Sequence, residues 1–265
     1  MNKIYKLLAI ATIMLSASCS TDSMSGGEFN NGTSYSEGKG GSMARFCIVD
    51  NILFTVDQSS LNSFDISVPE KPVFLSARTQ ELKNVGIETI FPMDSLLFIG
   101  AKDGMYIYSI SNHGLLQQLS TTSHILSCDP VVAQGNYAYV TLNSSNVWCG
   151  RNSNILQVYD ITDLTKPKHI RNIEGFVSPK GMGIDGDKLF VCDRILTMYD
   201  ISDREFPTPK YDLYNAHIYD VEDAYDVITL NNETLILVAS SGIYQLDYSD
   251  DTFRLISKIE VKRKN

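Results

Sequence analysis

An alternating run of apolar and polar residues at positions 155–159 breaks into Asp160-Ile161-Thr162 and then into a turn that contains Pro167. Short alternating runs bounded by turn residues predict β-strands that are half buried. The same pattern recurs, so that five copies of one unit fill the chain from about residue 43 to the end. The other copies carry the signatures Asp65-Ile66-Ser67, Ser109-Ile110-Ser111, Asp200-Ile201-Ser202 and Asp247-Tyr248-Ser249.

Each unit contains about four strand-like runs joined by short turns, such as residues 131–133, 137–142, 155–160 and 169–173 of the third unit. Successive signatures, counted from Asp65, lie 44, 51, 40 and 47 residues apart. A period near 45 residues with four strands per unit is typical of a β-propeller blade. No stretch sustains the 3.6-residue apolar spacing of a helical repeat. The sequence therefore predicts an all-β fold, a β-propeller with five blades of four antiparallel strands. Six blades remain the alternative, if a divergent unit is merged with its neighbour.

The recurring signature of Asp followed two residues later by Ser or Thr has a local explanation. Both side-chain types bond to nearby backbone N–H groups where a strand ends, and the prolines that follow fix the outgoing turn. We therefore assign the signature a structural role and not a catalytic one.

Residues 135–167 make a family resemblance specific. They read Gly-Asn, Tyr-Ala-Tyr-Val and then Val-Tyr-Asp-Ile-Thr-Asp before a proline, and this pattern resembles the LVIVD-repeat family of secreted and lipid-anchored bacterial propellers. The resemblance covers all five units, more loosely in the second and fifth, where Ser109 replaces Asp and Tyr248 replaces an aliphatic residue. It implies a propeller with a binding role, and it transfers no catalytic residues.

The N-terminus has the features of a secretion signal. Lys3 and Lys6 precede an apolar run that is too short to span a bilayer, and residues 1–18 are interpreted as a lipoprotein signal peptide. The run ends in a stretch that resembles a lipobox, which implies that Cys19 is acylated and that the protein is held at the bacterial outer membrane, on its periplasmic or its outer side. Residues 19–42 are rich in Ser and Gly and predict a flexible tether, which leaves residues 43–265 for the propeller.

The formal net charge of -9 argues against nucleic acid as a partner and against electrostatic docking on anionic lipid. Contact with the membrane is expected only through the N-terminal anchor. The folded region also contains no nucleophile elbow, His-rich metal motif or glycine-rich phosphate loop, so no catalytic residue, metal or cofactor is predicted.

Ligand sites in propellers gather at the face where the inner strands begin. Aligning the units on Phe54, Phe98, Tyr139, Phe190 and Leu237 places four ionisable residues at the start of the inner strands, namely Glu88, Asp129, Lys180 and Asp226. We expect these side chains to face a common funnel and to bind a polar ligand. The alternative is a hydrated channel mouth whose polar lining serves only solubility.

Two long loops reach the same face. Residues 143–154 carry the only tryptophan, Trp148, together with Cys149 and Arg151, and an exposed aromatic suits stacking on a sugar or anchoring a partner protein. The alternative is that Trp148 folds back onto its own blade. Cys149 is positioned to pair with Cys128 or with Cys192, and Cys128 is favoured; Cys47 is expected to be buried. The second loop, residues 214–225, carries the candidate ligand residue His217.

Three functions are consistent with these features. The first is a non-catalytic cell-envelope lipoprotein that binds a glycan or an envelope protein through the loop face. The second is a glycosidase or lyase that uses the funnel carboxylates, since two acids suffice for glycoside hydrolysis. The third is a scaffold subunit of an outer-membrane complex. The fold alone does not choose among them.

Overall fold

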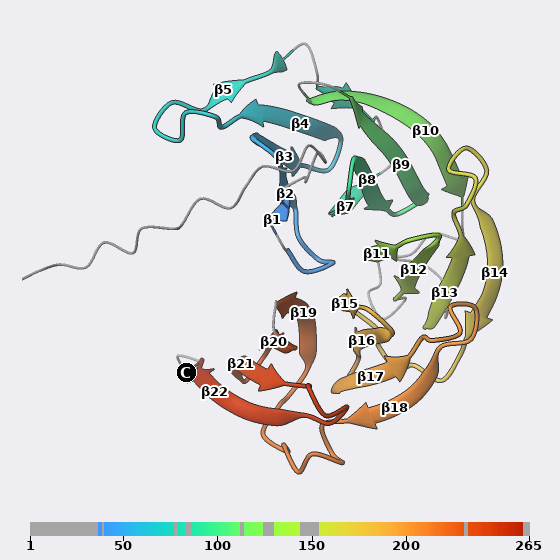
Figure 1. Cartoon of the computed structure of the whole chain (residues 1–265), viewed down its shortest axis with the longest axis vertical. Coiled ribbons are helices and arrows are strands. Elements are labelled where there is room, and N and C mark those ends of the chain that lie inside the picture. The colour runs from blue at the N-terminus through green and yellow to red at the C-terminus, as the bar shows by residue number, and fades with distance from the viewer. Residues whose placement is uncertain are drawn as a thin grey trace, which may run out of the picture. The chain divides into compact units, whose positions relative to one another are not determined.

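The computed structural model describes residues 37–38, 40–76, 79–82, 86–111, 114–123, 130–143, 154–230 and 233–261. All of them belong to one compact unit, Tyr35–Asn265. They form five antiparallel sheets, and no α-helix occurs among these residues. Figure 1 shows the sheets arranged around a common axis as the blades of a propeller. The predicted all-β propeller of five four-stranded blades is therefore confirmed.

The strands of each blade run in chain order from the axis outward. Blade 1 contains β2 (Phe46–Val49), β3 (Ile52–Val56), β4 (Ser60–Asp65) and β5 (Val73–Phe74), with β1 (Glu37–Gly38) added beside β2 and β6 (Gln80–Glu81) beside β4. Blade 2 contains β7 (Ile87–Met93), β8 (Leu96–Ala101), β9 (Gly104–Ser111) and β10 (Leu115–Ser123). Blade 3 contains β11 (Val131–Gln134), β12 (Tyr137–Leu142), β13 (Ile155–Asp160) and β14 (Lys168–Ile173). Blade 4 contains β15 (Met182–Asp185), β16 (Lys188–Cys192), β17 (Leu196–Asp200) and β18 (Thr208–Asp212). Blade 5 contains β19 (Ala224–Leu230), β20 (Thr234–Ala239), β21 (Gly242–Asp247) and β22 (Arg254–Glu260).

The turn between the two innermost strands explains the Gly and Asp residues found there. A residue with positive φ occurs in this turn in every blade: Asp50, Asp94, Gly135, Gly186 and Glu233. Tight hairpin turns need positive φ because only that geometry matches the twist of the flanking strands. Gly, Asn and Asp tolerate this conformation best, which is why these turns could be placed from the sequence.

The Asp-x-Ser/Thr signature stabilises the end of the third strand, as predicted. The Asp160 carboxylate accepts a hydrogen bond from Thr162 N at 2.8 Å, and the same bond recurs at Asp65, Asp200 and Asp247. The middle residue of the signature donates its N–H to a carbonyl in the inner hairpin turn, as Ile161 does to Asn136 O at 2.8 Å. The second bond occurs in all five blades. The signature therefore ties the third strand of each blade to its inner hairpin.

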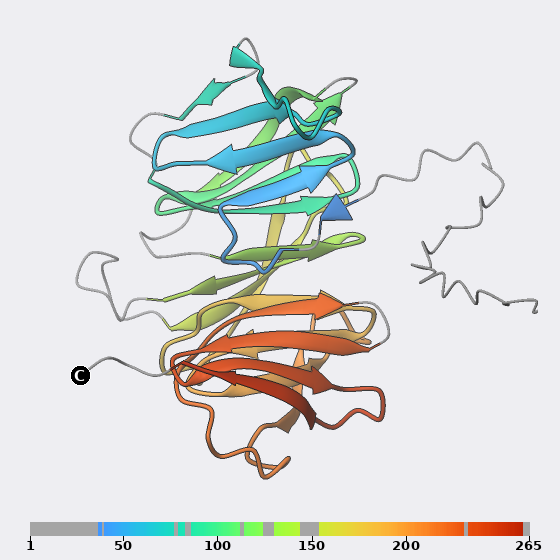
Figure 2. The ribbon, with the colours of Figure 1, turned by 90° about the vertical axis from the view of Figure 1, so that its left-hand side faces the viewer.

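Hydrophobic side chains fill the spaces between adjacent blades. The five second-strand residues used to align the units are fully buried: Phe54, Phe98, Tyr139, Phe190 and Leu237. Four clusters join blade 1 to blade 2, blade 2 to blade 3, blade 3 to blade 4 and blade 4 to blade 5. Among the described residues, no such cluster joins blade 5 to blade 1, and Figures 1 and 2 show the ring of ribbons open between them.

A short N-terminal strap, defined here as Gly38 and residues 40–43, lies at this open junction. Gly38 pairs with Ile48, and the fully buried Ser42 accepts a hydrogen bond from Met182 N of blade 4 at 2.6 Å. A Cβ at Gly41 would lie 1.9 Å from Asp226 Oδ2 of blade 5, so a larger residue there would displace the Asp226 carboxylate. The described residues of the strap therefore contact blades 1, 4 and 5.

Candidate functional site

The upper cavity, of about 340 Å³, lies at the face where the inner strands begin. Its lining includes Arg45 of blade 1, Glu88 and Thr89 of blade 2, Lys180 before blade 4 and Tyr225 of blade 5. The structure thus brings Glu88 and Lys180 to one cavity, as the alignment of the units predicted. Met43, Pro130, Asn143 and Pro179 complete the lining.

Hydrogen bonds between blades hold this lining in place. Arg45 donates from Nη2 to Ile87 O at 3.3 Å and from Nε to Glu88 O at 3.2 Å, which ties blade 1 to blade 2. Thr141 donates from Oγ1 to Lys180 O at 2.6 Å, and Gly181 donates from its backbone N to Tyr225 O at 2.8 Å. Because these bonds join adjacent blades, the cavity is preorganised and does not depend on one loop.

Charges of both signs surround the cavity. The Lys180 ammonium pairs with the Asp223 carboxylate at 3.2 Å and lies 4.8 Å from the centroid of the Tyr225 ring. Arg45 and Glu88 add one charge of each sign. Such a balanced, hydrogen-bonding lining suits a polar ligand of low net charge better than a strongly ionic one.

The loop between β18 and β19 leads directly into this lining. Tyr214 and Tyr219 are 56% and 63% exposed, and their ring centroids are 6.2 Å apart at an interplanar angle of 32°. His217 lies edge-on to Tyr219, with Nδ1 2.6 Å from the Tyr219 hydroxyl, and it has a positive φ of 59°. We call these three residues the aromatic loop. It places the predicted ligand residue His217 beside two exposed tyrosine rings.

Asp226 is not among the residues that line the upper cavity. It lines a separate cavity of about 300 Å³ between blade 5 and blade 1, together with Gly41, Phe46 and Ile228. Its carboxylate accepts hydrogen bonds from Ser42 Oγ at 3.5 Å and Met43 N at 3.3 Å. Burial nevertheless raises the pKa of Asp226 to about 7, because desolvation of the charged form outweighs these hydrogen bonds. Asp226 therefore holds the strap and lines a different cavity from Glu88.

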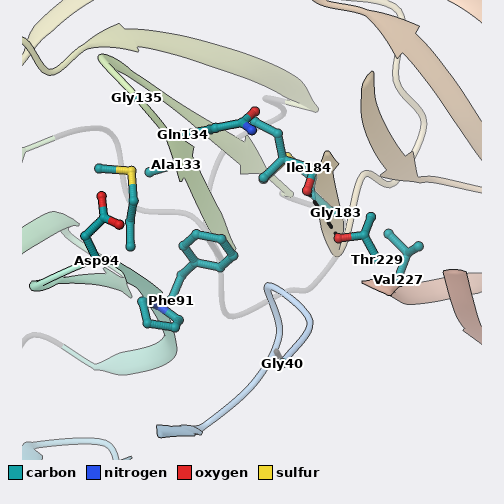
Figure 3. Close-up of a pocket in the computed structure, with 13 residues that line it drawn as sticks. Gly40, Phe91, Asp94, Ala133, Gln134, Gly135, Gly183, Ile184, Val227 and Thr229 are labelled. Carbon is teal, nitrogen blue, oxygen red and sulfur yellow. Dashed lines mark hydrogen bonds between the residues drawn. The ribbon is translucent and has the colours of Figure 1, made fainter. Parts of the chain in front are cut away.

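The lower cavity, of about 250 Å³, lies where the inner strands end. Figure 3 shows Phe91, Ala133, Ile184 and Val227 around it, with Thr229 donating to Ile184 O at 3.2 Å. Gly40 lines this cavity and Met43 lines the upper one, so the strap crosses the channel between them. The strap therefore lies between the two cavities, and fewer charged side chains line the lower one.

Several predicted site residues lie outside the described residues: Asp129, Trp148, Arg151, Cys128, Cys149 and the acylation site Cys19. Cys47 is 2% exposed, in agreement with the prediction that it is buried. Cys192, the alternative partner of Cys149, is fully buried and in no disulfide with a described residue, and burial raises the pKa of its thiol.

Three further lining or neighbouring residues escaped the sequence analysis, namely Arg45, Tyr214 and Tyr225. Arg45 follows Ala44, the residue of the first unit that aligns with Glu88 and Lys180, and Tyr225 precedes Asp226 of the fifth unit. A shift of one residue therefore separates the predicted lining from the observed one at both strands. Within the described residues, no three His, Cys, Asp or Glu side chains gather as a metal site. The same part of the chain contains no helix of the length and hydropathy needed to span a membrane.

Comparison with known proteins gives the fold only. No family model matches the chain, and no curated protein matches it. Among solved structures it resembles a functionally unknown protein from Desulfotomaculum acetoxidans DSM 771, with a TM-score of 0.62 and 11% identity over 86% of this chain and 70% of that one. It also resembles apo AztD from Citrobacter koseri, with a TM-score of 0.58 and 14% identity over 78% of this chain and 59% of that one. A periplasmic gluconolactonase of Pseudomonas aeruginosa, PpgL, gives a TM-score of 0.57 and 13% identity over 80% of this chain and 68% of that one.

Proposed function

We propose that this protein is a non-catalytic binding protein of the bacterial cell envelope whose loop face takes a glycan. The observation that carries the proposal is the hydrogen-bonding upper cavity together with the exposed aromatic rings of the loop that ends at its lining. Tyr225 lines the cavity, and Tyr214 and Tyr219 lie on the loop that leads to it. Sugars are recognised by aromatic faces that cover their C–H groups and by polar groups that bond their hydroxyls, because each ring has both kinds of surface.

The residues of the other long loop extend this proposal. Trp148 and Arg151 belong to the insertion that follows Asn143, and Asn143 lines the upper cavity. An indole and a guanidinium at this position would add a further stacking surface and a hydrogen-bond donor for the same ligand. Asp129 precedes Pro130 of the lining and would add a carboxylate.

An enzyme acting on polysaccharide is the second candidate, because a pKa of about 7 would suit Asp226 as a general acid. Glycoside hydrolysis needs two carboxylates on either side of one bond. Glu88 lines the upper cavity and Asp226 lines the cavity between blades 5 and 1, which argues against such a pair. The binding function is therefore preferred.

The aromatic loop provides the test of glycan binding. We expect the intact protein to bind at least one oligosaccharide on an array of neutral and acidic glycans. Tyr214→Ala combined with Tyr219→Ala should weaken that binding by about tenfold, equivalent to roughly 1.4 kcal/mol, because the stacking surface is lost. Isothermal titration with the best-binding oligosaccharide measures the change.

The matched control is Phe206→Ala, which removes an aromatic ring that is 46% exposed on another part of blade 4. It should leave the dissociation constant within twofold of the unmodified protein. Equal affinity in the double tyrosine variant and the unmodified protein would remove the aromatic loop from the site. An array on which no glycan binds would contradict the proposed function itself.

A further inference from the structure

Blade 5 has two apolar faces, but only one of them is packed. One face contributes Val227, Leu237 and Tyr244 to the cluster with blade 4, and all three are fully buried. Directly paired residues share a face, so the opposite face is defined by the pairs Ile228–Ile236, Val238–Ile243 and Ile243–Ile259. Ile243 and Ile259 are 37% and 66% exposed. We call this surface the open face of blade 5.

Blade 1 has a matching surface on the other side of the junction. A row of paired residues crosses the sheet from Ile48 to Leu53, Phe64 and Phe74, with Phe46 beside it on the same face of β2. Phe46 is 60% exposed and Phe74 is 50% exposed. We call this the open face of blade 1. Its reverse side, which includes Phe54, is packed against blade 2.

The sequence of these strands is that of sheets buried on both sides. β20 contains the uninterrupted run Leu235 to Ala239, and β2 and β3 are nearly as apolar. Strands that have one face in water alternate between apolar and polar residues, whereas continuous apolar runs are typical of two-sided burial. The open faces therefore have the composition of an interface and not of a free surface.

The two open faces meet at one cavity. Phe46 and Ile48 of blade 1 and Ile228 of blade 5 line the same cavity of about 300 Å³ beside the strap. The other four junctions between adjacent blades are each closed by a hydrophobic cluster. The junction between blade 5 and blade 1 is thus equivalent in the ring to four packed interfaces. Among the described residues, no hydrophobic cluster covers either of its two faces.

We propose that this junction binds a four-stranded antiparallel sheet of another polypeptide, apolar on both faces, which packs between blade 5 and blade 1 as a sixth blade. A face of four strands about 4.8 Å apart and about five residues long measures roughly 300 Å². The added sheet would contact blade 5 with one face and blade 1 with the other, and each contact would bury roughly 300 Å² on either partner. The total of roughly 1,200 Å² reaches the lower range of stable, specific interfaces.

Two other occupants fit less well. A second copy of this chain has one free face on blade 1 and one on blade 5, so it has no sheet with two free faces to place in the junction. Residues 20–36 of the chain contain only Met24, Phe29 and Tyr35 as large apolar side chains, too few to cover two blade faces. Both remain outcomes of the test below.

Photo-crosslinking in cells that produce the protein tests this proposal. The photoreactive residue p-benzoylphenylalanine is placed at Phe46 in one variant and at Ile243 in another, and the adducts are sequenced by mass spectrometry. We expect both positions to capture the same second protein, through peptides that belong to neighbouring apolar strands. The same residue placed at Val68, which is 51% exposed in the turn between β4 and β5, should not capture it.

Three results would overturn the proposal. They are adducts of the protein with a second copy of itself, adducts with its own residues 20–36, and the absence of an adduct at both positions. A Phe46→Asp variant separates loss of binding from loss of folding. It should keep the melting temperature of the isolated protein within about 2 °C, since the side chain is exposed, and should lose the captured partner in size-exclusion chromatography with light scattering.

Discussion

Asp226→Asn should raise the free energy of unfolding by about 4 kcal/mol at pH 8 but by less than about 2 kcal/mol at pH 5. The Asp226 carboxyl lies against the strap, where burial raises its pKa from 3.8 to about 7. An asparagine has a similar shape and no charge at any pH. It should therefore keep the contact with Ser42 and remove the cost of burying a carboxylate.

The sign of this effect follows from proton linkage. Between about pH 4 and about pH 7 the folded chain holds a proton on Asp226 that the unfolded chain releases. Stability therefore falls as the pH rises through this range, by at most roughly 1.4 kcal/mol per pH unit for one group. The signature residues act in the opposite direction. Hydrogen bonds from Ser and Thr lower the pKa of Asp160, Asp200 and Asp247, so their contribution is lost as the pH falls below about 4.

Urea unfolding at pH 5, 6, 7 and 8 measures this pH dependence. The stability of the unmodified protein should decline from pH 5 to pH 7, and Asp226→Asn should flatten this decline. Asp200→Asn is the control, because the pKa of that carboxyl is lowered and its titration lies outside this range. If the Asp226→Asn variant lost stability between pH 5 and pH 8 as steeply as the unmodified protein, Asp226 would not be the group responsible.

Phe54→Ala should cost about 4 kcal/mol of stability, whereas Phe46→Ala should cost less than about 0.5 kcal/mol. Phe54 is fully buried in the cluster between blades 1 and 2, so its removal leaves a cavity in a packed core. Phe46 lies on the adjacent strand of the same blade, on the open face, and is 60% exposed. The two variants remove the same side chain from opposite faces of one sheet.

Chemical denaturation of the two variants under one set of conditions gives the comparison. Equal losses of stability would mean that Phe46 is packed in the isolated protein. The junction between blades 5 and 1 would then be closed, and no partner would be needed to fill it. A small loss for Phe46→Ala agrees with an open junction and supplies a folded variant for binding experiments.

Features repeated within each unit could be predicted from the sequence. The inner hairpin turns are marked by Asp50, Asp94, Gly135 and Gly186, since positive φ restricts which residues fit. The buried second-strand residues follow from alternation, and the signature follows from the ability of Asp to bond two residues ahead. Aligning the units by these markers was enough to place Glu88 and Lys180 at one cavity.

Contacts between distant parts of the chain could not be predicted. Ser42 bonds to Met182, 140 residues later, and Gly41 lies against Asp226. Residues 38–42 are Gly, Lys, Gly, Gly and Ser, a composition that indicates a tether when it is considered alone. The cavity between blades 5 and 1 also needs coordinates, because apolar runs show that a strand has two buried faces but not what covers them.

Hydrogen–deuterium exchange with the best-binding oligosaccharide from the array tests most directly whether the loop face is the binding face. We predict that the ligand slows exchange in residues 43–45, 178–181 and 213–225, which surround the upper cavity and the aromatic loop. Exchange at the hairpin face, around Asp94, Gly135 and Gly186, should stay the same. Protection at those turns without protection around Lys180 and Tyr225 would contradict the assignment of the site.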